Sequence, residues 1–160
     1  PQQGALALLL PNNDTEENIL NGKTMDAYQR FYSLQQSEME HHILKLRANV
    51  RESVSGFSPE LCQLAALDAV LGDTTSVASR RLFTVIPKLL RQRFNFLYEE
   101  QQKTLTAASE DDTQLWLAVG GWLDNFHKEM QGLLLAELEV RLQPVLGLIE
   151  ALEERTEKNL

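Results

Sequence analysis

The sequence predicts an all-α protein, and three observations support that class. Apolar residues recur at three- and four-residue spacing from about Met25 to Glu157, which is the period of one helix face. The interruptions are residues that begin, end or kink helices, namely Ser58-Pro59, Gly72, Pro87 and Pro144. Strand-like alternation is absent. We expect a mostly antiparallel bundle of four long helices plus a C-terminal helical segment, with residues 24–160 forming a single helical domain.

The composition is that of an ordinary globular domain with an acidic surface. Hydrophobic residues make up 43% of the 160 residues, enough for a core that needs no disulfide or metal. The 23 acidic and 15 basic residues leave a formal net charge of -8, which disfavours bulk affinity for nucleic acid or an anionic membrane. Cys62 is the single cysteine and fits a reducing compartment. No run approaches the roughly 18 apolar residues of a membrane span.

Residues 1–23 are expected to form an irregular N-terminal arm. They contain two prolines and the turn-forming clusters 12–15 and Asn21-Gly22. The apolar run Ala5–Leu10 is short and has no basic residue before it, so it does not resemble a signal peptide. Because the chain begins with Pro1 rather than methionine, we expect it to be a fragment.

The first two helices are predicted from their caps. Thr24 is the expected N-cap of a helix over about 24–54. A second helix spans 59–71, with Ser58 as N-cap, Pro59 at the first position and Gly72 as the stop. Since LCQLAALDAVL is apolar nearly all round, we expect this helix to be buried and Cys62 to be inert within it. The apolar stripe of the first helix comprises Tyr28, Tyr32, Met39, Ile43, Leu46 and Val50.

The second half of the chain predicts two further long helices. One spans about 75–107, and Pro87 within it predicts a kink near 84–87. The other spans about 113–143 with Gly120-Gly121 in its interior, and Pro144 begins or kinks the C-terminal segment. Seven-residue spacing of its apolar residues favours left-handed bundle packing. The two rows are Trp116, Leu123 and Met130, and Val119, Phe126, Leu133 and Val140.

A basic face is predicted on the helix over 75–107. From Thr74 to Leu97 the sequence has bases but no acid. One interpretation is a solvated face, or one neutralised by acids such as Glu137 and Glu139. The functional interpretation is a site for an acidic protein partner; nucleic acid is an alternative, although four bases neutralise only about four phosphates. The bases, which share an arc of about 100° on a helical wheel, are Arg80, Arg81, Lys88 and Arg91.

Two acidic residues occupy positions where apolar residues are expected. Asp68 shares a helix face with Leu61 and Leu64, and Glu137 follows Met130 by one heptad. Buried carboxylates require partners. We predict that Asp68 pairs with an arginine of the helix over 75–107, and that Glu137 pairs with Arg141 one turn on. These three are interpreted as structural polar residues.

A di-metal site is the sharpest catalytic alternative. Glu38-x-x-His41 and Asp124-x-x-His127 have a spacing that metal-binding helical bundles use. However, Glu38 and His41 point away from the apolar stripe of their helix, whereas His42 lies on its edge and is expected to be half-buried and hydrogen-bonded. No nucleophile elbow or phosphate-binding loop is present. The sequence therefore predicts no enzyme activity, cofactor or metal.

Three segments carry a family resemblance: SPELCQLAALDAVL at 58–71, RRLFTVIPKLLRQRF at 80–94 and WLDNFHKEMQGLLLAELEVRLQPVLGLIEAL at 122–152. In these segments the chain resembles an uncharacterised bacterial family, domain of unknown function thirty-three forty-eight. The resemblance implies a cytoplasmic bacterial protein and brings no known activity and no catalytic residues.

The functional prediction is a non-enzymatic cytoplasmic adaptor that docks a protein partner through helical surfaces. The long helices and the apolar supply, which includes two tryptophans, also favour a homodimer. Two alternatives stay open. One is a nucleic-acid-binding regulator that uses the basic face, and the other is a di-metal enzyme that uses Glu38, His41 and His127.

Overall fold

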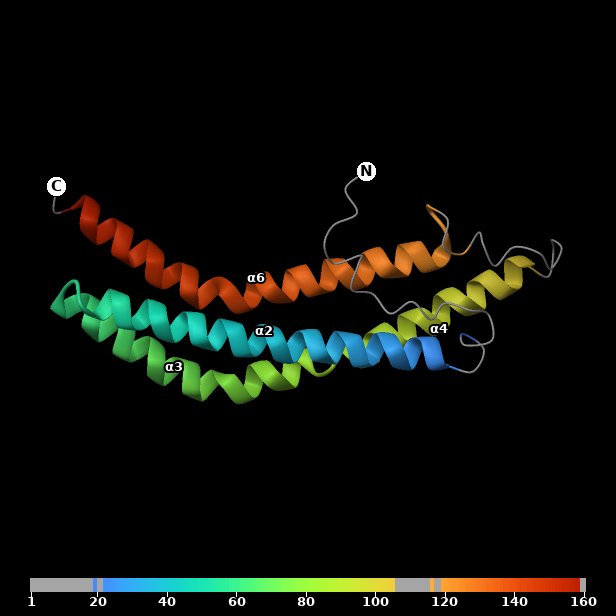
Figure 1. The fold of residues 1–160 in the computed structure, drawn as a ribbon, viewed down its shortest axis with the longest axis horizontal. Coiled ribbons are helices and arrows are strands. Elements are labelled where there is room, and N and C mark those ends of the chain that lie inside the picture. Colours follow the sequence, from blue (N-terminus) through green and yellow to red (C-terminus); the bar gives the residue numbers. More distant parts are fainter. Residues whose placement is uncertain (1–18, 20–21, 106–115, 117–118, 159–160) are drawn as a thin grey trace. The chain divides into compact units, whose positions relative to one another are not determined.

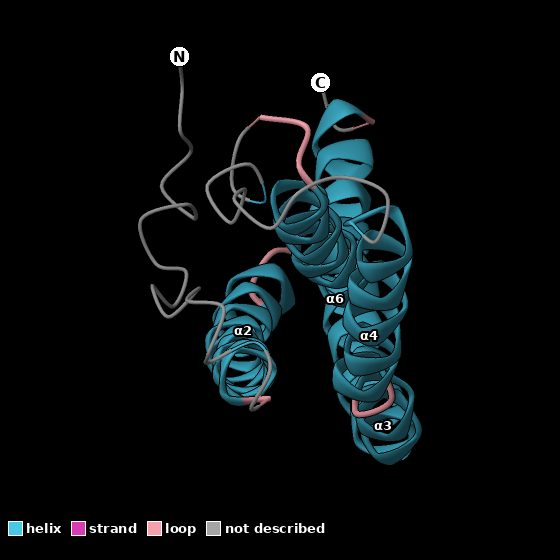
Figure 2. Ribbon diagram, turned by 90° about the vertical axis from the view of Figure 1, so that its right-hand side faces the viewer, coloured by secondary structure: helices cyan, strands magenta, loops and turns pink. Residues whose placement is uncertain are grey.

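The computed structural model describes residues 19, 22–105, 116 and 119–158. Within these residues it contains helices and no strand (Figures 1 and 2), so the predicted all-α class is confirmed. The expected arm over 1–23 lies outside the described residues, apart from Ile19, Gly22 and Lys23. The described helices are α2 (Lys23–Ser55), α3 (Pro59–Phe83), α4 (Ile86–Leu105) and α6 (Trp122–Glu157).

The chain divides into two compact units. Unit 1 comprises residues 1–35 and 84–135, and unit 2 comprises residues 36–83 and 136–160. Within the described residues each unit packs three helical segments: the first parts of α2 and α6 with α4 in unit 1, and their remaining parts with α3 in unit 2. The expectation of one domain over 24–160 stays a prediction.

In unit 2, α3 runs antiparallel to both of its neighbours. Its ion pairs and ring contacts join residues of rising number on α3 to residues of falling number on α2 and α6. Three helices packed in this way enclose a small core, built on Val54, Leu61 and Leu148. The contacts that fix the direction are Asp68 with Arg47 and Arg80 with Glu40 across α2, and Glu60 with Arg155 and Phe83 with Arg141 across α6.

Unit 1 has an aromatic core. Tyr28 of α2, Phe94 of α4 and Phe126 of α6 have ring centroids 5.2–6.2 Å apart in tilted or edge-on geometry. Trp122 lies edge-on to Phe94 at 5.3 Å. These four rings are all buried, and such arrangements add to the free energy gained from apolar burial alone.

The two predicted N-caps have different outcomes. Ser58 caps α3 as predicted, because its Oγ accepts the Leu61 N–H at 3.2 Å and Pro59 takes the first helical position. The Thr24 cap is wrong. The Gly22 carbonyl accepts the Asp26 N–H at 3.0 Å, so α2 begins after Gly22 and Thr24 lies buried in the first turn.

Gly120 lies in a turn that precedes α6, not in the helix interior that the sequence predicts. Its φ of 88° is a left-handed conformation, which favours glycine and ends a right-handed helix. The Gly120 N–H donates to Asp124 Oδ2 at 2.8 Å, a carboxylate closing the first turn as in a capping box. The Lys128 ammonium and this N–H hold the pKa of Asp124 below its usual range. Before residue 119, the predicted helix lies outside the described residues except for Trp116.

Replacing Gly120 with alanine is expected to lower the free energy of unfolding by about 1–2 kcal/mol, because an L side chain is disfavoured at a φ of 88°. Gly132→Ala is the matched control. A β-carbon there meets nothing within 4 Å, and alanine favours a helix interior over glycine by about 1 kcal/mol. Urea unfolding of both variants should therefore give opposite signs, and equal stabilities would contradict the role of the turn.

The helix boundaries inside the chain correct three predictions. α3 continues through Gly72, where a β-carbon would come within 3.1–3.4 Å of the Arg47 guanidinium, so this glycine provides room for Arg47 rather than a stop. α3 ends at Phe83 and α4 begins at Ile86. Two separate helices therefore meet just before Pro87, in place of the single kinked helix that the sequence predicts. Pro144 lies inside α6, so of the two predicted alternatives it does not begin a separate C-terminal helix.

The continuity of α6 through Pro144 has a simple energetic reason. Proline removes one backbone hydrogen bond and crowds the preceding turn. Val145 and Leu148 are only 2% and 3% exposed, and burying each of them contributes about 1.5–3 kcal/mol. Tertiary packing therefore offsets the local loss.

Candidate interaction surfaces

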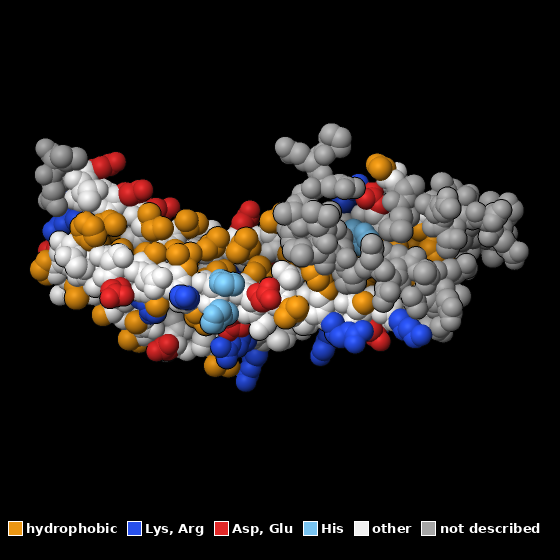
Figure 3. Space-filling view, in the orientation of Figure 1, with side chains coloured by type: hydrophobic (Ala, Val, Ile, Leu, Met, Phe, Trp, Pro, Cys, Tyr) orange, Lys and Arg blue, Asp and Glu red, His pale blue; other side chains and the backbone are white. Residues whose placement is uncertain are grey.

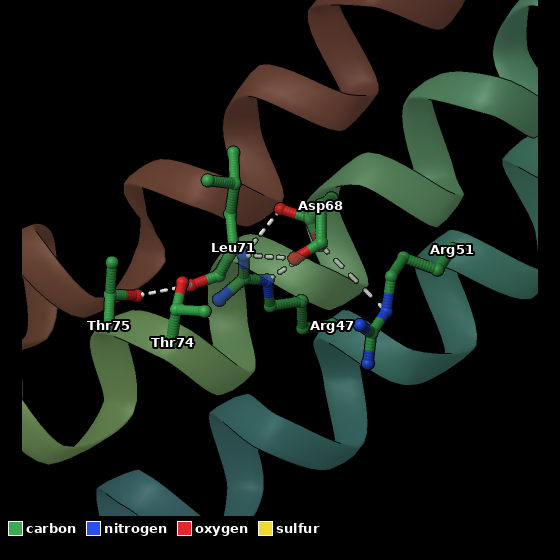
Figure 4. A network of polar contacts seen from close by, with 6 residues as sticks. All are labelled: Arg47, Arg51, Asp68, Leu71, Thr74 and Thr75. Carbon is green, nitrogen blue, oxygen red and sulfur yellow. Dashed lines mark hydrogen bonds and ion pairs between the residues drawn. The ribbon is translucent and has the colours of Figure 1, made fainter.

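Asp68 of α3 is held by two arginines of α2 (Figure 4). Its Oδ2 accepts a hydrogen bond from Arg47 Nε at 2.8 Å, its Oδ1 accepts one from Arg47 Nη2, and Arg51 Nε lies 3.8 Å away. Asp68 therefore has a partner, but the predicted partner is wrong. Because α3 is one continuous helix, Arg80 lies about 18 Å farther along the axis, and the neighbouring helix supplies the cations.

Asp68→Asn is expected to lower the free energy of unfolding by about 2 kcal/mol, because it weakens charge-assisted hydrogen bonds between side chains that are only 12% and 15% exposed. Asp26→Asn is the matched control. Asp26 pairs with Arg91 through side chains that are 56% and 40% exposed, and exposed pairs contribute about 0–1 kcal/mol. Thermal unfolding of both variants measures the difference, and equal losses would contradict the structural role of Asp68.

Glu137 is a fully buried carboxylate in unit 2 whose predicted pairing is confirmed. Its Oε1 accepts hydrogen bonds from Arg141 Nε at 2.9 Å and Nη2 at 2.7 Å, and its Oε2 accepts one from Gln36 Nε2 at 2.8 Å. Gln36 also donates to the Phe83 carbonyl at 2.9 Å. The Arg141 guanidinium lies 4.3 Å from the Phe83 ring centroid. The network thus satisfies a carbonyl at the end of α3 and joins the three helices.

The four bases predicted to form one face belong to two helices. Arg80 and Arg81 lie on α3, and Lys88 and Arg91 lie on α4. The helix breaks between them, so a single helical wheel does not describe them.

Two of these bases are used within the chain. Arg80 pairs with Glu40 at 2.6 Å, and Arg91 contacts Asp26 and Gln29 with Nη2–oxygen distances of 2.5 Å. The neutralising acids therefore come from α2 rather than from Glu137 and Glu139.

The three candidate metal ligands do not lie together in a metal-binding arrangement. Glu38 and His41 are exposed, and so is His42, which was expected to be half-buried. Three helical segments cover less of each helix than a four-helix bundle does. His127 Nε2 lies 2.6 Å from Tyr28 Oη. Within the described part of the chain, no three histidine, cysteine or acidic side chains gather as metal ligands.

Unit 2 combines its small core with many exposed apolar side chains. On α3 only Leu61 and Ala65 are buried, so the prediction of a buried helix, with Cys62 inside it, is wrong; Cys62 is exposed. Figure 3 shows hydrophobic side chains in a row along α6 and at the edge of α3. The exposed large apolar residues of unit 2 are Leu44, Leu46, Phe57, Leu67, Val70, Leu71, Val77, Leu82, Val140, Leu146 and Ile149.

A groove of about 200 Å³ lies among α2, α3 and α6 in unit 2. Small side chains of α3 form part of its wall. Its charged lining residues are paired: Arg47 with Asp68, Arg80 with Glu40, and Arg141 with Glu137. The α3 lining includes Gly72, Thr75, Ser76 and Ser79, and the apolar lining includes Ile43, Leu44, Leu82, Phe83, Val140 and Pro144.

These features define an all-helical protein with apolar surfaces. None of its described helices combines the length and apolar character of a membrane span. The chain belongs to the family described as "Protein of unknown function (DUF3348)", whose profile matches residues 7–154. The match extends beyond the segments that carried the sequence resemblance and includes the N-terminal third. No curated protein and no solved structure matches the chain.

Proposed function

We propose that this chain is a non-enzymatic adaptor that docks an apolar helix of a protein partner in the groove of unit 2. The groove volume carries the proposal. At about 200 Å³ it falls below the roughly 300–1,000 Å³ typical of small-molecule sites. It exceeds the roughly 150 Å³ cavity that accommodates benzene. It therefore suits one large apolar side chain of a partner better than a cofactor.

The lining supports an uncharged, helical occupant. The charges around the groove are compensated within unit 2, so a charged ligand would have to break an existing pair. Leu82 and Val140, which line the groove, are 72% and 59% exposed, and they offer apolar contact to either side of an inserted side chain. A helix with apolar residues at three- and four-residue spacing meets such a surface with successive anchors.

The proposal also includes a bacterial cytoplasmic location and a mostly antiparallel helical bundle. The family resemblance and the single cysteine support the first. The direction of α3 against α2 and α6 supports the second. A nucleic-acid regulator has less support, because Arg80 and Arg91 are paired with acids of the same chain. A di-metal enzyme has less support, because His127 contacts Tyr28 and Glu38 and His41 are exposed.

Site-specific photo-cross-linking in cells tests the groove. A photoreactive residue at Leu82 is expected to capture a protein partner, whereas one at the exposed Glu52 of α2 is not. Ser76→Phe fills the groove and should abolish the adduct. Ser53→Phe makes the same change on the exposed surface of α2 and should preserve it. Capture that survives Ser76→Phe would refute the groove as the docking site, and an adduct of twice the chain mass would indicate a second copy instead.

A further inference from the structure

Over residues 65–79, the outward face of α3 carries the larger apolar side chains, whereas Leu61, nearer the start of the helix, is buried in the core of unit 2. Leu67, Val70, Leu71 and Val77 are 51–61% exposed and recur at three-, four- and seven-residue spacing. Over the same stretch, the face toward α2 and α6 carries small or polar residues, among them Ala65, Asp68, Gly72, Ser76 and Ser79. A helix that packed only within its own unit would show the opposite distribution. The pattern indicates that the outward face is covered in an assembly.

We propose that this face of α3 binds the same face of a second copy of the chain, as an antiparallel helix pair about a two-fold axis. Identical surfaces meet in a two-fold interface. In an antiparallel pair the same flank of each helix meets across the interface. Asp73 and Arg80 are seven residues apart and therefore share one flank of the apolar face. Asp73 of each copy then lies opposite Arg80 of the other, which gives two ion pairs.

The charges of this flank favour a second copy over an unrelated partner. Asp73 has no ion pair within the described part of the chain, and its side of α3 is exposed. The Arg80 side chain is 61% exposed even though it pairs with Glu40, so it can also contact a second carboxylate. An acid and a base a heptad apart on the same flank can pair with the same two residues of a second copy only when the two helices are antiparallel. A parallel pair would place Asp73 against Ala78 instead.

The register that pairs Asp73 with Arg80 also fits the apolar side chains. It brings Thr74 of one helix against Val77 of the other, and Leu71 against Ala78, so that larger residues meet smaller ones. The Thr74 hydroxyl donates to the Leu71 carbonyl at 2.9 Å (Figure 4) and needs no new partner when the face is covered. A single helix pair lies at the low end of specific interfaces, below about 1,200 Å². The dimer should therefore be reversible and depend on concentration.

Charge-exchange variants of the full chain, measured by sedimentation equilibrium, test the pairing. Asp73→Arg puts two bases on the flank and Arg80→Asp puts two acids there, so each variant alone should dimerise at least tenfold more weakly than the native chain. An equimolar mixture should recover the dimer, because every base then meets an acid. A native chain that stays monomeric at millimolar concentration, or a mixture no stronger than its components, would overturn the proposal.

Cysteine cross-linking tests the direction of the pair. In a Cys62→Ala background, Thr74→Cys lies near the two-fold axis and should form dimers with a short bismaleimide. Gln63→Cys lies on the same face, but its two copies would be roughly 37 Å apart along an antiparallel pair and should not cross-link. Cross-linking at both positions would overturn the antiparallel arrangement. Ser76→Phe should leave the dimer intact, so failure of the partner groove and failure of this interface are distinguishable.

Discussion

Replacing Phe126 with alanine is expected to lower the free energy of unfolding by about 3–5 kcal/mol, the loss typical of a large side chain removed from a packed core. The Phe126 side chain is 0% exposed. Its ring centroid lies 5.6 Å from that of Tyr28 and 5.2 Å from that of Phe94. Alanine would leave a cavity where α2, α4 and α6 meet in unit 1. Urea unfolding followed by circular dichroism measures the loss.

Phe96→Ala is the matched control for this prediction. Phe96 is 52% exposed and its ring centroid lies 5.6 Å from the Arg93 guanidinium carbon. An exposed cation–π contact contributes about 0.5–1 kcal/mol, so this variant should lose no more than about 1 kcal/mol. Similar losses for the two phenylalanines would contradict the position of Phe126 as the centre of the core.

Seven-residue spacing identified much of the unit 1 core but not its limits. Trp116, Leu123, Phe126 and Met130 are buried as the two predicted rows require. Val119, Leu133 and Val140 belong to one of these rows in sequence yet are 95%, 39% and 59% exposed. Periodicity shows which residues share a helix face, whereas their burial depends on how many neighbours cover that face. In the described part of the chain, each unit packs three helical segments, which cover less of a helix than the predicted four-helix bundle would.

Local chemistry was predictable where a single residue decides it. Ser58 and Pro59 begin α3 through their own cap geometry, and Glu137 finds Arg141 because the two lie one turn apart. Gly72 and Asp68 depend instead on Arg47 of another helix, which no sequence spacing reveals. A mid-helix glycine signals either a stop or a close approach, and only the tertiary partner distinguishes them.

The candidate surfaces also depend on tertiary packing, which sequence spacing does not reveal. Residues 61–71 of α3 are apolar on nearly every side, and this pattern predicts an interior helix, yet only Leu61 and Ala65 of α3 are buried. Its outward residues, such as Leu67 and Val70, are more than half exposed. The predicted basic face assumed one helix through Thr84 and Val85, where α3 has ended and α4 has not begun. Helical periodicity predicts neither which face of a helix is buried nor where one helix gives way to the next, because both depend on tertiary packing.

Arg141→Met is the second change with a large expected effect. It would leave the Glu137 carboxylate, which is 0% exposed, without its cation, and removing one partner of a buried pair typically costs about 3–5 kcal/mol. Arg155→Met is the matched control. Arg155 pairs with Glu60 at 3.1 Å through side chains that are 42% and 64% exposed, so less than about 1 kcal/mol should be lost.

The double variant Glu137→Leu with Arg141→Met separates the ion pair from the packing around it. Replacing both partners of a buried pair with apolar residues is often neutral or stabilising by about 1–4 kcal/mol, so the double variant should be more stable than Arg141→Met alone. A double variant that is no more stable than Arg141→Met alone would instead mean that Arg141 acts through the Phe83 ring. Recovery in the double variant would show that unit 2 tolerates an apolar junction, and that the Glu137 network specifies the register of α2, α3 and α6 more than it stabilises them.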